Sequence, residues 1–256
     1  MVSPLRHVVT SRRAILLAGL AGIIALSWVY LVWMEHAMYG PDASCPMHTT
    51  PDWTLGYAAM TFLMWVVMMI AMMLPSTAPM VVAVETIART RGRPPTLPWI
   101  FLVGYIAVWS GFSAGATAVQ WMFHRLAVLA PMDLTVTPVL GGVLLVAAGV
   151  YQWMPYKQSC LQRCSPLAFL LQEWREGPGG AFLMGLRHGA FCVGCCAALM
   201  LLLFVAGVMN LLWIAILATV VLVEKLAGPR PRLNSTLALL LVFAGLGLSL
   251  EALWRR

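Results

Sequence analysis

The chain has 256 residues, of which 61% are hydrophobic and only 10% are charged, and its mean hydropathy is +0.87. Soluble domains carry roughly 25% charged residues, so this composition excludes a soluble protein and predicts an integral membrane protein. The net charge of +7 lies in short basic clusters between apolar runs, as in polytopic membrane proteins. We therefore expect a lipid bilayer around the chain and no nucleic-acid partner.

The apolar runs predict an all-α transmembrane bundle of about seven helices, because a bilayer-spanning helix needs about 20 apolar residues. A single domain over residues 1–256 is expected, with helices near 14–34, 54–74, 97–121, 138–155, 182–206, 209–226 and 235–254. The second helix is expected to end at Pro75. The stretch from Gly189 to Val223 has no charge in 35 residues and is too long for one helix, so we expect a turn at Gly207–Asn210.

The distribution of Lys and Arg predicts the orientation, because these residues are retained on the cytoplasmic side. With the N-terminus inside, 13 of them fall on the inner side: Arg6, Arg12, Arg13, Arg89, Arg91, Arg93, Lys157, Arg163, Arg175, Arg187, Lys225, Arg230 and Arg232. The outer side holds 3, which are Arg125, Arg255 and Arg256. The expected topology is N-in and C-out, in an inner (plasma) membrane.

Two pairs of glycines predict places where helices pack closely. Gly111 and Gly115 share one helix face, and so do Gly185 and Gly189. Small residues at this spacing let helix backbones approach each other in a membrane. The pattern is common in membrane bundles and indicates no chemistry.

Methionines are concentrated in the second predicted helix, where six occur among the 14 residues from position 60 to position 73. Four of them repeat at a spacing of four and form a slowly winding stripe along about 20 Å of membrane depth; they are Met60, Met64, Met68 and Met72. Thioether sulfur is soft and uncharged and suits Cu(I). Methionine is also a flexible apolar filler, so both readings stay open.

Soft ligands also cluster in the fifth predicted helix, in the segment His188-Gly-Ala-Phe-Cys192-Val-Gly-Cys195-Cys196. On an ideal helix these four side chains lie within about 100° of arc, but about 12 Å separates the first from the last. One ion cannot reach all four. We expect Cys192 with Cys195 or Cys196 to bind a metal, and His188 to be a neighbour or a second station.

Two further groups could bind metal. Cys160 and Cys164 lie on the predicted cytoplasmic loop after the fourth helix, where Lys157 and Arg163 favour thiolates; a reduced structural pair is the alternative. On the outer side, the loop between the first two helices carries three ligand types in four residues: Cys45, Met47 and His48. A single outer thiol is free, metal-bound or paired with another protein.

Three segments of the chain carry motifs that are specific in combination. They are Met64–Ser76 with Pro79; Gly149–Gln152 with Cys164–Pro166; and Gly185–Cys196, continued by Leu199-Met200, Gly207, Met209-Asn210 and Glu224-Lys225. In these segments the sequence resembles a bacterial family of predicted metal-binding integral membrane proteins. One departure is Ala197, where many members have tryptophan. The resemblance implies a bound metal, without its identity or use.

Three functions fit these residues. The leading hypothesis is the binding of Cu(I) for delivery, acceptance or translocation, with zinc as the second choice and a metallochaperone or membrane protein as partner. The enzyme alternative is a membrane thiol–disulfide oxidoreductase, although Cys45 has no second outer cysteine. The third is a non-catalytic assembly subunit. Other enzyme signatures are absent, and Glu251 is the single acidic residue within an apolar run.

Overall fold

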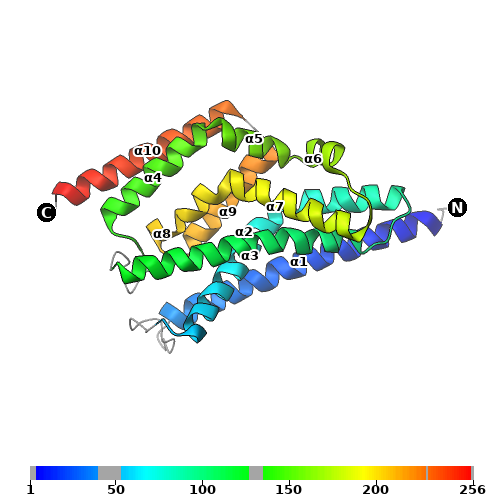
Figure 1. Ribbon diagram of the computed structural model, residues 1–256, viewed down its shortest axis with the longest axis horizontal. Helices are drawn as coiled ribbons and strands as arrows, with labels where there is room; N and C mark the ends of the chain where they lie inside the picture. The colour runs from blue at the N-terminus through cyan, green and yellow to red at the C-terminus, as the bar shows by residue number, and fades with distance from the viewer. Residues whose placement is uncertain (1–3, 40–52, 127–134, 229, 255–256) are drawn as a thin grey trace.

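The computed structural model describes residues 4–39, 53–126, 135–228 and 230–254. These residues form helices and no β-strand (Figure 1), so the predicted all-α class is confirmed. The helices are α1 (Pro4–Tyr39), α2 (Leu55–Thr90), α3 (Leu97–Arg125), α4 (Pro138–Trp153), α5 (Pro155–Arg163), α6 (Pro166–Glu173), α7 (Gly177–Leu201), α8 (Leu203–Ala206), α9 (Leu211–Ala227) and α10 (Pro231–Trp254).

Five of the described helices are long and apolar enough to cross a bilayer: α1 within Arg12–Ala37, α2, α3, α7 continued by α8, and α10. The pair α4 and α5 is a sixth candidate if it counts as one span, although it bends by 66°. α9 has 17 residues, or about 26 Å of helix against a hydrocarbon core of about 30 Å. The described residues thus offer five to six such helices where the sequence predicts seven.

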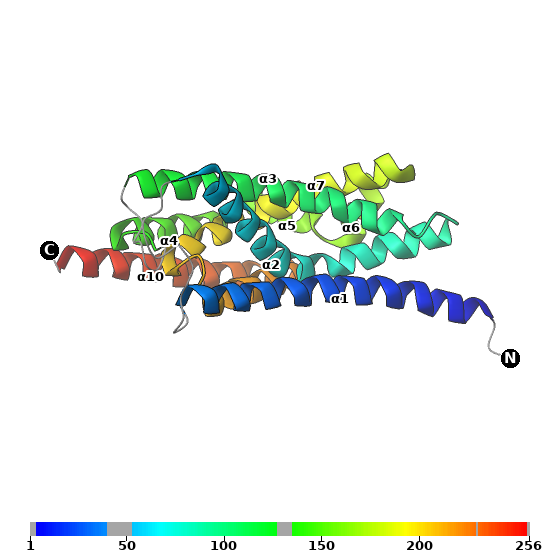
Figure 2. The ribbon, with the colours of Figure 1, turned by 90° about the horizontal axis from the view of Figure 1, so that it is seen from below.

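α2 passes through Pro75 and Pro79, so the predicted end of this helix at Pro75 is wrong. A proline inside a helix donates no backbone hydrogen bond and destabilises the turn before it. Here the hydroxyl groups of Ser76 and Thr77 donate to the carbonyl oxygen of Met73 at 2.8 and 3.2 Å. α2 also packs against α1, α3 and α9, with α1 on one side of the molecule and α3 with α7 on the other (Figure 2). This packing and the hydroxyl bonds stabilise the helix beyond its prolines.

Glycines bring α3 and α7 into close contact. A methyl group on Gly185 would collide with the backbone of Phe101, and one on Gly189 would lie 2.9 Å from Cβ of Val108. By contrast, Gly111 and Gly115 have open space where a methyl group would lie. Of the two predicted pairs, the one on α7 therefore lies in a close helix contact and the one on α3 does not.

A turn at Gly207–Asn210 separates α8 from α9. Gly207 has a φ of +97°, a conformation that side-chain-bearing residues rarely adopt. The Asn210 side chain then caps α9 by accepting the backbone N–H of Trp213 at 3.1 Å. The turn brings α9 back along α2 and α7, and this places the charged end of α9 beside the cysteines of α7.

Candidate metal centre

Three cysteines lie on one face of α7, at positions i, i+3 and i+4. Cys192, Cys195 and Cys196 are each at most 2% exposed. The thiols of Cys195 and Cys196 donate to the carbonyl oxygen of Cys192 at 3.1 and 2.7 Å. The structure therefore turns this face into the protein interior, where other segments reach it.

A fourth cysteine reaches α7 from α5. After the bend that follows α4, α5 packs against α7, and Gly194 allows a close approach, because a Cβ there would lie 2.8 Å from Cys160 Sγ. Cys164 Sγ, just beyond the last residue of α5, lies 3.9 Å from Cys195 Sγ. The connecting segment with Cys160 and Cys164 was expected to put both thiols on one face if it is helical. It forms the short helix α5, which starts at Pro155 and has Cys164 as its C-cap.

The cations near these two cysteines have other partners. Lys157 is fully buried and pairs with both carboxylate oxygens of Glu224, at 2.8 and 2.9 Å, while it also donates to Gln152. The guanidinium group of Arg163 lies 5.2 Å from the centre of the Phe191 ring. Lys157 is thus engaged by Glu224 and Gln152, and the expectation that Lys157 and Arg163 favour thiolates at Cys160 and Cys164 stays a prediction. Lys157 is also no loop charge, because it lies inside the protein.

One methionine of α2 reaches the thiols. Met73 Sδ lies 3.8 Å from Cys196 Sγ. Met73 does not belong to the predicted stripe, because it lies about 100° around the helix from Met72, the last methionine of the stripe. Within the stripe, Met60 is 46% exposed. The other three methionines are buried: Met64, Met68 and Met72.

The remaining cysteine of α7, Cys192, has polar partners. Its Sγ lies 2.8 Å from Lys225 Nζ on α9 and 3.1 Å from the hydroxyl oxygen of Tyr105 on α3. Lys225 Nζ also donates to Ser76 Oγ on α2 at 2.9 Å. Four helices thus meet around one sulfur atom, and one of them contributes a positive charge.

His188 lies one helical turn before Cys192 in an aromatic environment. The centres of the Phe101, Tyr105 and Phe169 rings lie between 5.2 and 5.7 Å from its own. Its Nδ1 is buried and has no hydrogen-bond partner among the described residues. The imidazole therefore keeps one nitrogen without a hydrogen bond in the interior. His188 is close to the cysteines in sequence, but it takes part in none of the sulfur contacts described above.

The described residues contain no group of three or more His, Cys, Asp or Glu side chains arranged to hold one metal ion. They offer two sulfur pairs instead, Cys164 with Cys195 and Cys196 with Met73. Two sulfur atoms bound to one ion at about 2.3 Å each lie at most about 4.6 Å apart, and the pairs, at 3.9 and 3.8 Å, meet this limit. Soft pairs of this kind suit Cu(I), whereas a structural zinc site takes four ligands.

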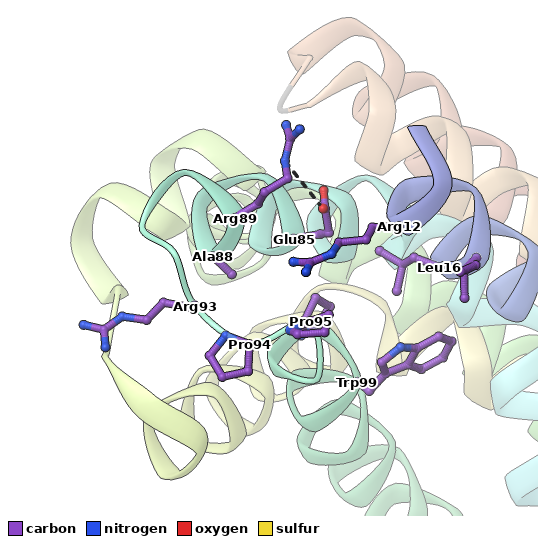
Figure 3. Close-up of a pocket in the computed structure, with 11 residues that line it drawn as sticks. Arg12, Leu16, Glu85, Ala88, Arg89, Arg93, Pro94, Pro95 and Trp99 are labelled. Carbon is purple, nitrogen blue, oxygen red and sulfur yellow. Dashed lines mark ion pairs between the residues drawn. The ribbon is translucent and has the colours of Figure 1, made fainter. Parts of the chain in front are cut away.

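The predicted outer ligands Cys45, Met47 and His48 lie outside the described residues. A cavity of about 240 Å³ opens elsewhere, between α1, α2 and the start of α3 (Figure 3). None of its lining residues is Cys, Met or His. Two of its arginines pair with carboxylates: Arg89 with Glu85 at 3.7 Å and Arg93 with Glu176 at 2.7 Å. This cavity is not the sulfur site.

Sequence reasoning missed the polar residues around the thiols. Lys225 was counted among the basic residues of the inner side, Glu224 was given no role of its own, and Glu251 was taken as the single acidic residue within an apolar run. Glu224 and Glu85 are in fact buried. The available signal was the Glu224-Lys225 pair itself, since it ends the long uncharged stretch that carries the cysteines.

The model of the PpoB2 family, described as copper chaperones, matches residues 62–248. No curated protein and no solved structure matches the chain. The matched segment exceeds half of the chain and contains Met73, Cys164, the α7 cysteines and Lys225, whereas the outer ligands precede it. The match confirms the expected metal-binding family and identifies copper as the metal that this family handles. The chain therefore belongs to the PpoB2 copper chaperone family.

Proposed function

We propose that this protein is an integral membrane copper chaperone, which holds Cu(I) at the sulfur atoms of Met73, Cys164, Cys195 and Cys196 and passes it to a protein partner. The observation that carries the proposal is the convergence of these atoms from α2, α7 and the end of α5. Cu(I) is the cargo in this account. The partner is a metallochaperone or another membrane protein.

The low number of ligands suits a carrier. Each sulfur pair offers two donors, so a bound Cu(I) keeps room for a further ligand. An incoming thiolate of a partner can bind the ion before a resident sulfur leaves, because Cu(I) accepts soft ligands readily. A closed four-ligand site would resist this exchange. The arrangement therefore favours transfer over permanent storage.

The exposed surface supports a position in a membrane. On α1, Ile15, Leu26 and Trp33 are each more than 60% exposed, and so are Leu240 and Phe243 on α10. Large apolar side chains in such numbers on the outer faces of long helices are expected when lipid surrounds the protein. With the basic residues on the inner side, we assign the N-in, C-out topology in a bacterial inner membrane.

The remaining candidate ligands fit a route toward the centre. The outer loop would capture copper, and the α2 stripe would offer thioethers between that loop and the thiols; these residues are Cys45, Met47, His48, Met60, Met64, Met68 and Met72. His188 would serve as a second station beside the cysteines. Affinity for Cu(I) rises from thioether to thiolate, so the gradient favours movement inward.

A thiol–disulfide oxidoreductase is the second candidate, and one contact favours it. Cys164 Sγ and Cys195 Sγ are 3.9 Å apart, and a rotation of the two side chains would bring them toward a disulfide bond of about 2.05 Å. The two proposals predict different states of the purified protein. A copper chaperone holds metal with reduced thiols, whereas the oxidoreductase holds a disulfide and no metal.

Metal analysis of the detergent-purified protein, loaded with Cu(I) without oxygen, tests the proposal. We expect stoichiometric copper in the parent and a lower copper content in Cys164→Ser and Cys195→Ser, each of which breaks one of the two sulfur pairs. Cys160→Ser is the matched control, since its sulfur faces Gly194 and forms neither pair, and it should retain all of its copper. Zinc in place of copper, or a copper content unchanged by the loss of Cys195, would contradict the proposal.

A further inference from the structure

We infer that Lys225 gives this centre its preference for a singly charged ion over a doubly charged one. The inference rests on the proposed function and adds to it a selectivity residue that binds no metal. Lys225 acts as a fixed positive charge beside Cys192, which lies one helical turn from the proposed ligands Cys195 and Cys196. The argument comes from its partners, from the neighbouring ion pair and from the formal charges of the two possible complexes.

The ammonium group of Lys225 faces the thiols. Its Nζ lies 2.8 Å from Cys192 Sγ and 2.9 Å from Ser76 Oγ. No carboxylate of the described chain forms an ion pair with it. A cation in the protein without an anion is costly, so the group requires negative charge from another source. Such charge arises when the thiolates one helical turn from Cys192 hold Cu(I).

The adjacent acid, Glu224, does not supply that charge. Both of its carboxylate oxygens bind Lys157 Nζ, at 2.8 and 2.9 Å. Consecutive residues of a helix point about 100° apart, which lets Glu224 face Lys157 while Lys225 faces Cys192. One buried cation is thus matched by one buried anion, and the second cation is left for the metal centre.

The charge of the bound ion then decides whether Lys225 stabilises the complex. Two thiolates, for example those of Cys164 and Cys195, form a complex of one net negative charge with Cu(I) and a neutral complex with Zn²⁺. The ammonium group attracts the first complex and is indifferent to the second. A third thiolate would make the zinc complex negative as well, but no three-ligand group exists among the described residues.

The size of the effect follows from Coulomb's law. As an order of magnitude, a unit charge roughly 5 Å from the ion, with an effective dielectric constant of about 20, changes a binding constant by on the order of 100-fold. This factor applies to the ratio of the Cu(I) and Zn²⁺ affinities. The ratio does not depend on the protonation of the free thiols, because both ions bind the same metal-free protein.

The test measures Cu(I), Ag(I) and Zn²⁺ affinities of the detergent-purified full chain by competition with chelators of known affinity. Lys225→Met should lower the Cu(I) to Zn²⁺ affinity ratio by about 100-fold, and the ratio for Ag(I), which is also singly charged, should fall equally. Lys225→Arg keeps the charge and should restore most of both ratios. Arg230→Met removes an exposed positive charge five positions away and should leave them unchanged.

A Lys225→Met protein with the parent's affinity ratios would overturn the inference and leave the proposed function intact. Equal weakening of all three ions would also overturn it, since that result indicates a structural role. If Lys225→Met fails to fold, Lys225→Gln, with its polar side chain, gives the same neutral state. A parent that binds neither Cu(I) nor Ag(I) would refute the proposed function and, with it, the inference.

Discussion

The contact between α3 and α7 holds the cysteine face in place, and Gly185→Ala should open it. A Cβ on Gly185 would collide with the carbonyl oxygen of Phe101 and would lie 3.0 Å from the backbone nitrogen of Tyr105. Both obstacles are backbone atoms, which cannot rotate away. The helices must therefore move apart, and the Tyr105 contact with Cys192 must lengthen.

The expected loss of stability follows from two opposing terms. Overpacking of an interior contact costs about 3 kcal/mol at the upper end of its usual range. Alanine is favoured over glycine in a helix by about 0.8 kcal/mol. Gly185→Ala should thus destabilise the protein by about 2 kcal/mol. Gly111→Ala, which meets nothing within 4 Å, should stabilise it by about 0.8 kcal/mol.

Unfolding by a denaturing detergent, followed by far-ultraviolet circular dichroism, measures both variants against the parent. We expect the midpoints to move in opposite directions, with a free-energy difference of about 3 kcal/mol between the variants. Equal stability of Gly185→Ala and Gly111→Ala would refute the close α3–α7 contact. Since copper binding adds stability, both variants are compared without metal.

Three other perturbations test the surroundings of the centre. Lys157→Met leaves Glu224 buried without its partner and should destabilise the protein by about 3–5 kcal/mol in the same unfolding assay, while a second change to Gln at 224 should recover part of the loss. The hydrogen bonds from Trp174 and Arg91 lower the pKa of Glu176, so its contribution to stability is present at neutral pH and is lost as the pH falls below the ordinary glutamate pKa of about 4.3. Glu176→Gln should flatten the dependence of stability on pH in this acidic range, and an unchanged slope would exclude the carboxylate as the cause. Reporter fusions should give cytoplasmic signals at Arg91, Arg163 and Arg230. An outer signal at any of these positions would contradict the N-in topology.

The helices could be predicted because apolar runs and basic clusters act locally along the chain. The end of α2 could not be predicted, because the prediction rested on Pro75 alone. The hydroxyl groups of Ser76 and Thr77 and the packing of α2 against its neighbours overrule that signal. The two glycine pairs show the same limit. They look alike in the sequence, yet only Gly185 and Gly189 face another helix closely, whereas Gly111 and Gly115 do not.

The candidate site was predictable in part. The spacing of Cys192, Cys195 and Cys196 places them on one helix face whatever surrounds the helix. Their partners depend on tertiary structure: the bend before α5 brings Cys164 to them, and the rotation of α2 selects Met73 over its neighbours. Charged residues at the end of an apolar run resemble residues of an exposed loop. That Glu224 and Lys225 point into the protein can therefore be seen only in the folded structure.

The most direct test of the central claim is X-ray absorption spectroscopy at the copper edge of the protein loaded without oxygen. The proposed centre predicts Cu(I) surrounded by two or three sulfur atoms at about 2.3 Å, with no nitrogen or oxygen neighbour in the parent. The double variant Cys195→Ser with Cys196→Ser breaks both sulfur pairs and should lose this signature. A copper ion bound mainly by nitrogen and oxygen, or a sulfur-bound copper that persists in the double variant, would contradict a centre built on these cysteines.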